Sequence, residues 1–260
     1  LHGSSAASDV YKRQFIEKYI ENAQHIEFQV LGDGTNAVHF GERFCSIQRR
    51  HQKILEEGPW LDEDTRNSMG QKVVEGAKKV GYSGLATFEF LRDSNGEFYF
   101  LEVNPRVQVE HTVTEQLTGF DLVSLGIRVA SGESIGISQG QIKLTGHAIQ
   151  VRINAEKPAD FSPAPGRLWE CLLPSGPGIR VDSHACSGYS MPRCFDSLLA
   201  KIISHGRDRE EAISRLDAAL RETVLDGVDT LIPLHRKILQ EPNFLNRNVS
   251  ISYLEDHNFG

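Results

Sequence analysis

The side chains best suited to chemistry lie close together in the stretch 98–115. This stretch carries three carboxylates, an asparagine, an arginine, a glutamine and a histidine on a predicted strand and its exit. Residues 86–91 alternate in hydropathy as a strand does, and Asn95-Gly96 between the two runs is a strong hairpin signal. A two-residue loop at Asn95-Gly96 places Glu89 directly opposite Glu102, on the same face of the sheet.

The predicted pair of carboxylates points to a metal site. Like charges directly opposite each other, with Cβ atoms only about 5 Å apart, destabilise a sheet unless a cation or a shared proton intervenes. Asn104 follows two residues after Glu102 on the same face, and this set of hard oxygen ligands suits Mg²⁺ or Mn²⁺ beside substrate phosphates. The alternative is an exposed polar strand face. We rank it lower because unpaired carboxylates are costly in a sheet partly buried by Phe88, Phe98 and Phe100.

Length and composition describe a globular chain. Its 260 residues, 39% of them hydrophobic, suffice for one large domain or two small ones. It has neither an apolar run of 18 residues nor a signal-peptide pattern, so we expect no membrane partner and a cytoplasmic location, with a mitochondrial matrix or plastid as alternatives. Four cysteines without CxxC spacing predict free thiols. The net charge of −7 argues against a nucleic-acid partner.

We expect strands with helices packed on them, in two parts that meet near residue 140. Residues 1–14 are rich in small side chains without periodicity and are interpreted as an assembly scar. Apolar spacing predicts a helix over 62–80, whose core face comprises Met69, Val73, Val74, Ala77 and Val80. Further predicted elements are strands at 25–31, 37–40, 147–156 and 198–204, and helices at 122–130, after the capping box 208–211, and at 234–239.

Two further features suggest anion recognition. The run 48–53 holds four basic or potentially basic side chains within five positions. Such a run is usually a solvated or nucleic-acid-contacting face, but it lacks interleaved aromatic residues, so we favour recognition of phosphate or bicarbonate inside a cleft. Arg152 shares one strand face with Gln150 and Asn154, and its alternative is an exposed arginine on an edge strand. The glycines of Gly32-Asp-Gly34 are explained by a hairpin turn, since no helix follows them.

Three motifs, in this order and spacing, resemble biotin carboxylase. They are Gln48-Arg-Arg-His-Gln-Lys53, Glu102-Val-Asn-Pro-Arg-Val-Gln-Val-Glu-His111 and Arg152-Ile-Asn-Ala-Glu156. The resemblance implies an α+β fold in two parts. Residues 15–140 would form the C-terminal half of an ATP-grasp domain, mostly an antiparallel sheet with packed helices, and residues 141–260 the biotin carboxylase C-terminal domain.

The sequence departs from the family pattern in two places. The family's N-terminal domain and its glycine-rich lid over the ATP phosphates should precede Phe15, so we expect a fragment with little activity of its own. Arg193-Cys194 stands where the family more often carries proline and aromatic residues.

The resemblance also implies a role for each matched residue. Glu110 would be the general base, Arg106 would orient bicarbonate, and Arg152 would hold bicarbonate and the developing biotin enolate. The metal ligands would be Glu89, Glu102 and Asn104, in agreement with the register argument. The bicarbonate and biotin site would comprise Lys53, Arg106, Gln108, Val109, Glu110 and Arg152. Contacts to adenine, ribose and phosphates would fall on Glu17, Lys18, Ile20, His25, Gln48, His51, Leu91 and Leu101, for which the alternative is ordinary hairpin packing.

The implied function is ATP- and bicarbonate-dependent carboxylation of biotin within an acetyl-CoA or other acyl-CoA carboxylase. It requires ATP, Mg²⁺ or Mn²⁺, and biotin as a carrier-bound substrate. The implied partners are a biotin carboxyl carrier protein or domain, a carboxyltransferase and a second copy in a homodimer. The close alternative is the corresponding part of pyruvate carboxylase. A fragment that serves only in dimerisation or carrier docking is the alternative of another class, and a basic nucleic-acid binder is a distant third.

Overall fold

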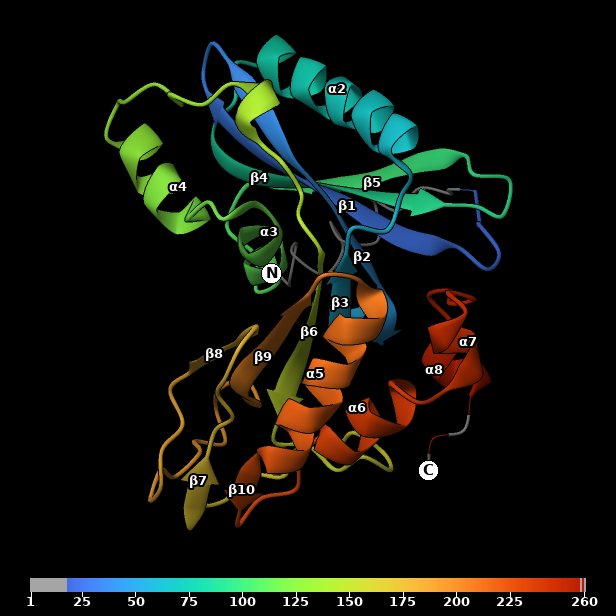
Figure 1. Ribbon diagram of the computed structural model, residues 1–260, viewed down its shortest axis with the longest axis vertical. Helices are drawn as coiled ribbons and strands as arrows, with labels where there is room; N and C mark the ends of the chain where they lie inside the picture. Colours follow the sequence, from blue (N-terminus) through green and yellow to red (C-terminus); the bar gives the residue numbers. More distant parts are fainter. Residues whose placement is uncertain (1–17, 258, 260) are drawn as a thin grey trace, which may run out of the picture.

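The computed structural model describes residues 18–257 and 259 and is drawn in Figure 1. The expected scar at residues 1–14 and the predicted nucleotide contact at Glu17 lie outside the described residues. Among the helices that are described, none is both long enough and apolar enough to cross a membrane.

One antiparallel sheet of eight strands organises the structure and confirms the expected α+β fold. Its strand order is β5-β4-β1-β2-β3-β6-β9-β8. Because β3 pairs directly with β6, strands from before and after residue 140 share this sheet. Its strands are β1 (Gln24–Asp33), β2 (Ala37–Arg49), β3 (Gln52–Gly58), β4 (Ser83–Arg92), β5 (Phe98–Asn104), β6 (His147–Asn154), β8 (Ile179–Ser183) and β9 (Leu198–Gly206), while β7 (Glu170–Leu172) and β10 (Val224–Asp226) pair separately.

Helices cover the sheet over an apolar core that runs through both parts of the chain. In Figure 1, α2 lies across the upper part of the sheet, and α5 lies along β9 and β6 in the lower part. The core joins Phe28 of β1 and Met69 of α2 to Ile149 of β6 and Leu216 of α5. The helices are α2 (Glu63–Lys79), α3 (His111–Thr118), α4 (Leu122–Ala130), α5 (Arg209–Glu222), α6 (Ile232–Ile238), α7 (Pro242–Leu245) and α8 (Tyr253–Asp256), with a short 3-10 helix, η1 (Gln139–Gln141).

Helix α2 forms where capping and apolar spacing predict it. The Asp62 carboxylate accepts a hydrogen bond from the Thr65 backbone N–H at 2.8 Å, so it caps the first turn. Met69, Val73 and Ala77 are buried as expected. The expected burial of Val80 is wrong. It is 74% exposed because the helix ends at Lys79 and the chain turns away there.

The turn between β4 and β5 differs from the predicted two-residue loop at Asn95-Gly96. The Asp93 N–H donates to the Glu97 carbonyl at 3.0 Å, and the Gly96 N–H donates to the Asp93 carbonyl at 3.0 Å. The loop therefore has three residues, and Gly96 closes it in the left-handed conformation with φ of 86°.

The predicted pairing of Glu89 with Glu102 is nevertheless confirmed. A three-residue loop alone would set Glu89 opposite Leu101. A bulge follows, because Phe90 pairs with Phe100 while Glu89 pairs with Glu102, which leaves Leu101 as the extra residue on β5. The longer loop and the bulge shift the strand register by one residue in opposite directions. Both carboxylates therefore lie on one face of the sheet.

Candidate active site

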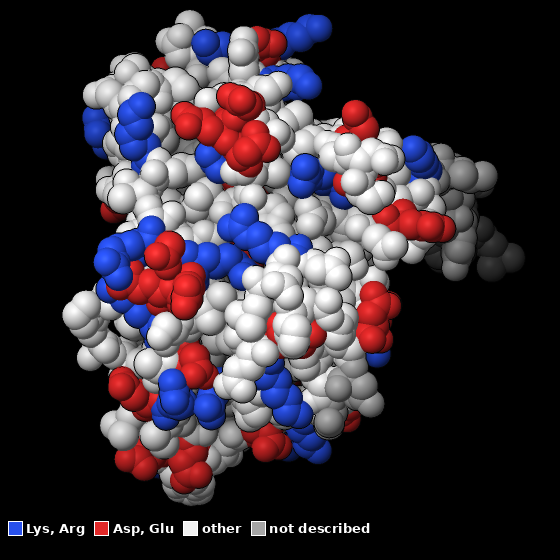
Figure 2. Space-filling view, turned by 45° about the vertical axis from the view of Figure 1, so that its right-hand side comes forward, with Lys and Arg blue, Asp and Glu red and all other residues white. Residues whose placement is uncertain are grey.

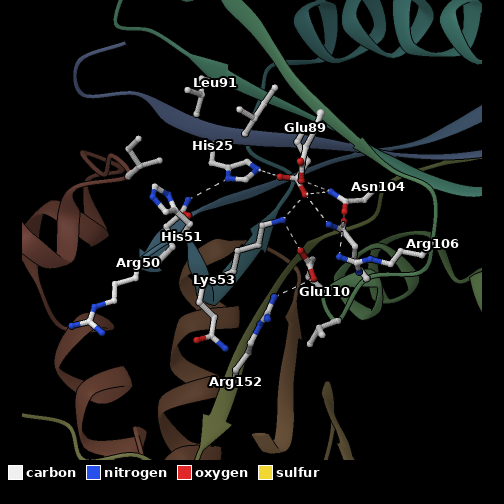
Figure 3. Close-up of a pocket in the computed structure, with 17 residues that line it drawn as sticks. His25, Arg50, His51, Lys53, Glu89, Leu91, Asn104, Arg106, Glu110 and Arg152 are labelled. Atoms are coloured by element: carbon white, nitrogen blue, oxygen red, sulfur yellow. Dashed lines mark hydrogen bonds and ion pairs between the residues drawn. The ribbon is translucent and has the colours of Figure 1, made fainter. Parts of the chain in front are cut away.

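A cavity of about 630 Å³ opens beside the carboxylate pair, and Figure 3 shows its lining. Its walls come from strands β1 to β6, from the β2–β3 turn, from the loop between β5 and α3 and from the segment before α8. Segments distant in the sequence thus meet at one place. The predicted site residues that line it are His25, Gln48, His51, Lys53, Glu89, Leu91, Leu101, Glu102, Asn104, Arg106, Gln108, Val109, Glu110 and Arg152.

Two of the described candidates lie away from this cavity. The Lys18 ammonium donates to the Tyr99 hydroxyl at 3.0 Å, and Ile20 is buried in packing. The cavity is also lined by three residues that were not assigned a role from the sequence, namely Arg50, Gln52 and Ile251. The motif 48–53 contains Arg50 and Gln52, so their position carried a usable signal. Ile251 lies far along the chain, where no motif marks it.

One end of the cavity suits a flat apolar ring with polar edges. Leu91, Leu101 and Ile251 supply apolar surface, and the Ile251 N–H is tied to the Ala23 carbonyl at 2.8 Å. The β2–β3 turn brings His51 to this end, with φ of 66° at His51 and 47° at Arg50. Left-handed backbone at two consecutive non-glycine residues costs free energy, and such strain clusters at functional sites. In Figure 3, Arg50 extends away from the acidic side chains.

A row of charged residues crosses four strands beneath the cavity. Arg43 on β2 pairs with Glu27 on β1, Glu27 pairs with Glu89 on β4, and Glu89 pairs with Glu102 on β5. Glu27 is fully buried and Glu89 is 4% exposed. Adjacent buried carboxylates require cations, because an uncompensated charge is costly in a sheet interior.

The Lys53 ammonium compensates the carboxylates at the centre of the site. Its Nζ lies 2.5 Å from Glu27, 3.0 Å from Glu89 and 2.8 Å from Glu110. Burial would raise the pKa of Glu27, but Lys53 and Arg43 lower it to about 2. Burial likewise opposes a charged Lys53, yet Glu27 and its neighbours raise the pKa of Lys53 well above its ordinary value. Both groups are therefore ionised at neutral pH.

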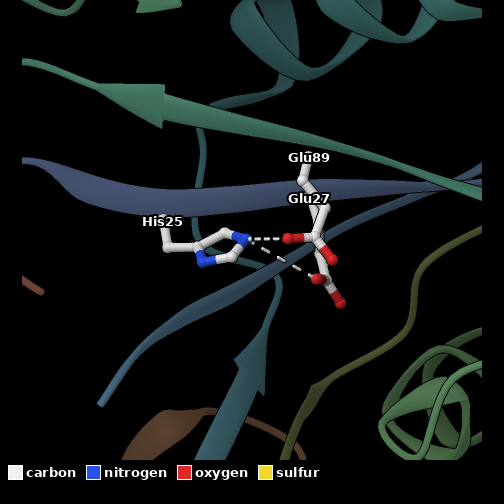
Figure 4. Close-up of side chains that lie close together, drawn as sticks. All are labelled: His25, Glu27 and Glu89. Carbon is white, nitrogen blue, oxygen red and sulfur yellow. Dashed lines mark ion pairs between the residues drawn. The ribbon is translucent and has the colours of Figure 1, made fainter. Parts of the chain in front are cut away.

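His25, Glu27 and Glu89 lie close enough to suggest a metal site, but their partners do not fit one (Figure 4). His25 Nε2 lies 2.8 Å from Glu89 and 3.9 Å from Glu27. The Gln48 amide N–H₂ donates to both the Cys45 carbonyl and His25 Nδ1, which leaves the imidazole proton on Nε2. The Lys53 ammonium also contacts both carboxylates. The Lys53 ammonium thus already neutralises charge between these two carboxylates.

Glu89, Glu102 and Asn104 fit a metal ion better. The Asn104 amide donates to Glu89 at 3.0 Å and to Glu102 at 2.9 Å, so the two carboxylates converge on one point at the cavity wall. Burial would raise the pKa of Glu89, but His25 and Lys53 lower it to about 2. Carboxylate oxygens are ligands that Mg²⁺ and Mn²⁺ prefer, whereas the Asn104 oxygen accepts a hydrogen bond from Arg106 and its amide nitrogen faces the carboxylates. The predicted metal residues therefore lie together, on the side of Glu89 away from Glu27.

We expect this chain to bind Mn²⁺ more tightly with ATP than without it, because phosphate oxygens complete the coordination shell. Glu102→Gln removes one anionic ligand and should weaken the ATP-dependent affinity by roughly tenfold or more. Titration followed by Mn²⁺ paramagnetic resonance measures this. Glu97→Gln, on the same hairpin but outside the cavity, is the control. Unchanged ATP-dependent binding in Glu102→Gln would rule out the paired-carboxylate site.

Glu110 lies at the centre of the cavity, where the chain leaves β5 and begins α3. It is 2% exposed, with Lys53 Nζ 2.8 Å from Oε1 and Arg152 Nη2 3.1 Å from Oε2. In Figure 3 these two cations approach the carboxylate from different strands. A carboxylate held at both oxygens beside open cavity space can accept a proton from a bound acid while nearby cations hold an anion.

Arg152 is fixed from below by Glu56 of β3. Its Nε donates to Glu56 at 2.7 Å, and the Gln150 amide donates to the same carboxylate at 2.9 Å. His235 of α6 contacts the Arg152 carbonyl oxygen at 2.8 Å. Burial raises the pKa of Glu56, and Arg152 opposes that rise. The expectation of an arginine on a rigid strand is confirmed, and the alternative of an exposed edge strand is wrong, since β6 lies between β3 and β9.

Arg106 and Gln108 complete the wall near the carboxylate pair. Gln108 donates to Glu89 at 2.7 Å, and Arg106 donates to the Asn104 side-chain oxygen at 3.2 Å while staying exposed. On the face seen in Figure 2, lysine and arginine side chains gather across the middle of the molecule, although the net charge is −7. With Lys53 and Arg152, Arg106 gives the cavity a local positive character that suits small anions.

Comparison with known proteins identifies related chains over both parts of this sequence. A family model described as "Carbamoyl-phosphate synthase L chain, ATP binding domain" matches residues 2–138. A second, described as "Biotin carboxylase C-terminal domain", matches residues 150–256.

Named relatives and solved structures agree with these matches. A biotin carboxylase of Nostoc sp. is 51% identical over 94% of this chain and 56% of its own length. A pyruvate carboxylase component of Methanothermobacter thermautotrophicus is 46% identical over 95% of this chain and 51% of its own. The biotin carboxylase domain dimer of Hydrogenobacter thermophilus 2-oxoglutarate carboxylase, solved with MgADP, ADP and bicarbonate, superposes with a TM-score of 0.91 at 45% identity, over 93% of this chain and 54% of that one. The chain thus spans about half the length of these relatives.

Proposed function

Because the chain belongs to the biotin carboxylase family, we propose that it holds the reaction centre of an enzyme that uses ATP and bicarbonate to carboxylate biotin on a carrier. The observation that carries this proposal is the position of Glu110. It lies between Lys53 and Arg152, in the same cavity as the Glu89–Glu102 pair. A base, two cations and a pair of metal ligands are what the joining of bicarbonate to a phosphoryl group requires.

Bicarbonate binds in this proposal against Glu110, with Arg106 and Arg152 holding its negative charge. The O–H bond of bicarbonate breaks and its proton bonds to Glu110. The electron pair stays on the bicarbonate oxygen, which forms a bond to the γ-phosphorus of ATP as the bond from that phosphorus to ADP breaks. The products are carboxyphosphate and ADP. Bicarbonate is a poor nucleophile until its proton is removed, so Glu110 promotes this step.

ATP lies with its base at the apolar end of the cavity and its phosphates towards the carboxylate pair. Leu91, Leu101 and Ile251 contact the base, while Gln48 and His51 bind polar atoms of the nucleoside. Glu89, Glu102 and Asn104 would hold Mg²⁺ or Mn²⁺, which neutralises charge on the phosphate oxygens when bound. Lys53 adds a fixed positive charge beside the transfer line.

Biotin carboxylation then depends on Arg152. Carboxyphosphate breaks down to CO₂ and phosphate, and phosphate takes the ureido proton of biotin. The resulting anion bonds to CO₂ beside the Arg152 guanidinium, which stabilises its charge. Arg152 reaches this position because Glu56 and Glu110 hold its guanidinium.

The partners of the whole protein are part of the proposal. They are a biotin carrier, a carboxyltransferase and a second copy of the chain, in the cytoplasm or an organelle matrix. The carboxyltransferase selects the final acceptor. Related chains include both biotin carboxylases and a pyruvate carboxylase component, so the shared half-reaction is what we assign. The complete set of base, cations and metal ligands favours an enzyme over a module that only docks the carrier.

The proposal predicts ADP formation that requires bicarbonate and increases with biotin. It should be assayed in a full-length enzyme that contains these residues, either the native one or a chimera with the remaining part of the Nostoc biotin carboxylase. Labelled bicarbonate should appear in acid-labile carboxybiotin only when ATP is present. A rate of ATP cleavage that does not depend on bicarbonate, with no label on biotin, would refute the assignment.

A further inference from the structure

Six buried or nearly buried side chains form a continuous series of ion pairs through the site, with charges that alternate along it. We call it the ion-pair chain. Glu110 is its fourth member, and its two ends, Arg43 and Glu56, lie on the neighbouring strands β2 and β3. In order, it runs Arg43, Glu27, Lys53, Glu110, Arg152 and Glu56, with successive N···O distances of 2.6, 2.5, 2.8, 3.1 and 2.5 Å.

The two carboxylates other than Glu110 are held by groups that keep their charge during the reaction. Glu27 is fully buried and also receives the Arg43 guanidinium, which itself donates to Gln29 and Thr114. Glu56 is fully buried and also accepts from the Gln150 amide at 2.9 Å. Neither carboxylate lines the cavity, so neither meets a substrate directly.

Proton transfer to Glu110 removes negative charge from beside the two neighbouring cations. When Glu110 accepts the bicarbonate proton, its charge changes from −1 to zero. Lys53 and Arg152 then lose an anionic partner at the same moment. A buried cation without a partner is strongly disfavoured, so each would move away or oppose the protonation of Glu110.

We propose that Glu27 and Glu56 are positioning residues that keep Lys53 and Arg152 paired, and therefore in place, while Glu110 is neutral. This inference rests on the proposed function, since it takes Glu110 as the base. Arg152 has two carboxylate partners and Lys53 has three, with Glu89 as the third, and of these only the shared partner Glu110 changes charge. Glu27 thus holds Lys53 for the transfer to ATP, and Glu56 holds Arg152 for the later reaction of biotin.

The proposal can be tested because Glu27 and Glu56 hold different cations. Glu56→Gln keeps the shape of the side chain but leaves Arg152 without a permanent anionic partner. Carboxybiotin formed per phosphate released should fall by roughly tenfold, while bicarbonate-dependent ATP cleavage falls much less, since Arg106 also holds bicarbonate. Glu27→Gln should instead lower both products together and raise the KM for bicarbonate, because Lys53 serves the first step.

Glu57→Gln is the matched control for Glu56→Gln. Glu57 is the neighbouring residue and is equally buried, but its carboxylate binds Arg209 at 2.6 Å and His147 at 2.7 Å. It should lower the unfolding midpoint without changing the ratio of carboxybiotin to phosphate. Glu56→Asp retains the charge and should recover part of the ratio. If Glu56→Gln does not fold, the ratio in Glu56→Asp decides, and an intermediate value is expected.

A wild-type ratio in both folded Glu56 variants, or an equal fall in the Glu57→Gln control, would overturn the positioning role. Failure of the proposed function has a different signature. In that case the unsubstituted full-length enzyme itself forms no carboxybiotin. An active, coupled parent with an unaffected Glu56→Gln variant refutes only the inference about the ion-pair chain.

Discussion

Glu110→Gln is expected to lower kcat for bicarbonate-dependent ATP cleavage by about 10²-fold or more, with little change in ATP binding. The amide has the same shape as the carboxylate but cannot accept the bicarbonate proton. The nucleotide end of the cavity is built from other residues, such as Leu91 and Ile251, so it is unaffected. ADP formation and the Kd for ATP should be measured in the full-length enzyme.

The fold should survive this substitution, because Lys53 and Arg152 retain Glu27 and Glu56 as partners. Glu115→Gln is a suitable control. Glu115 also belongs to α3, but its carboxylate binds Arg180 at 2.6 Å outside the cavity. A Glu110→Gln enzyme that retains more than about a tenth of the wild-type kcat would exclude general-base catalysis by this residue.

Arg152→Gln is expected to uncouple the two half-reactions. It removes positive charge where the biotin anion forms, so carboxybiotin should fall much further than phosphate release. Bicarbonate-dependent ATP cleavage should survive in part, since Glu110 and Lys53 remain. Phosphate and carboxybiotin should be measured side by side on the same samples.

The substitution should also destabilise the protein, because it leaves the buried Glu56 carboxylate without its cation. Removal of one partner from a buried ion pair costs about 3–5 kcal/mol of unfolding free energy. Arg152→Lys keeps the charge and serves as the control for stability. Equal loss of both products in folded Arg152→Gln would leave Arg152 with a structural role only.

The candidate site could be predicted from sequence to the extent that its residues lie on one hairpin or in a dense motif. The pairing of Glu89 with Glu102 is correct although the loop between their strands is one residue longer than predicted. The bulge at Leu101 restores the register, and no local pattern announces it. The prediction succeeded because two deviations cancel. A loop of different length still places the same side chains on one face of the sheet if a bulge in the strand restores the register.

The charged residues that support the site were missed for a physical reason. Glu27, Arg43 and Glu56 lie on strands that otherwise read as ordinary alternating segments, and a buried charge has no distinctive local pattern. Their significance follows from pairings between β1, β2 and β4 and between β3 and β6, which depend on the order of strands in the sheet. Ile251 reaches the cavity through a backbone bond to Ala23, far away in sequence.

The proposed reaction joins bicarbonate to the γ-phosphoryl group of ATP in this cavity. It is tested most directly by following oxygen. The full-length enzyme should be incubated with ATP, Mg²⁺ and bicarbonate labelled with ¹⁸O, and the released phosphate analysed by mass spectrometry. We predict that each phosphate carries one oxygen atom from bicarbonate, and that Glu110→Gln slows the appearance of this labelled phosphate by about 10²-fold. Phosphate that takes its new oxygen from water, at a rate that does not depend on Glu110, would contradict the account.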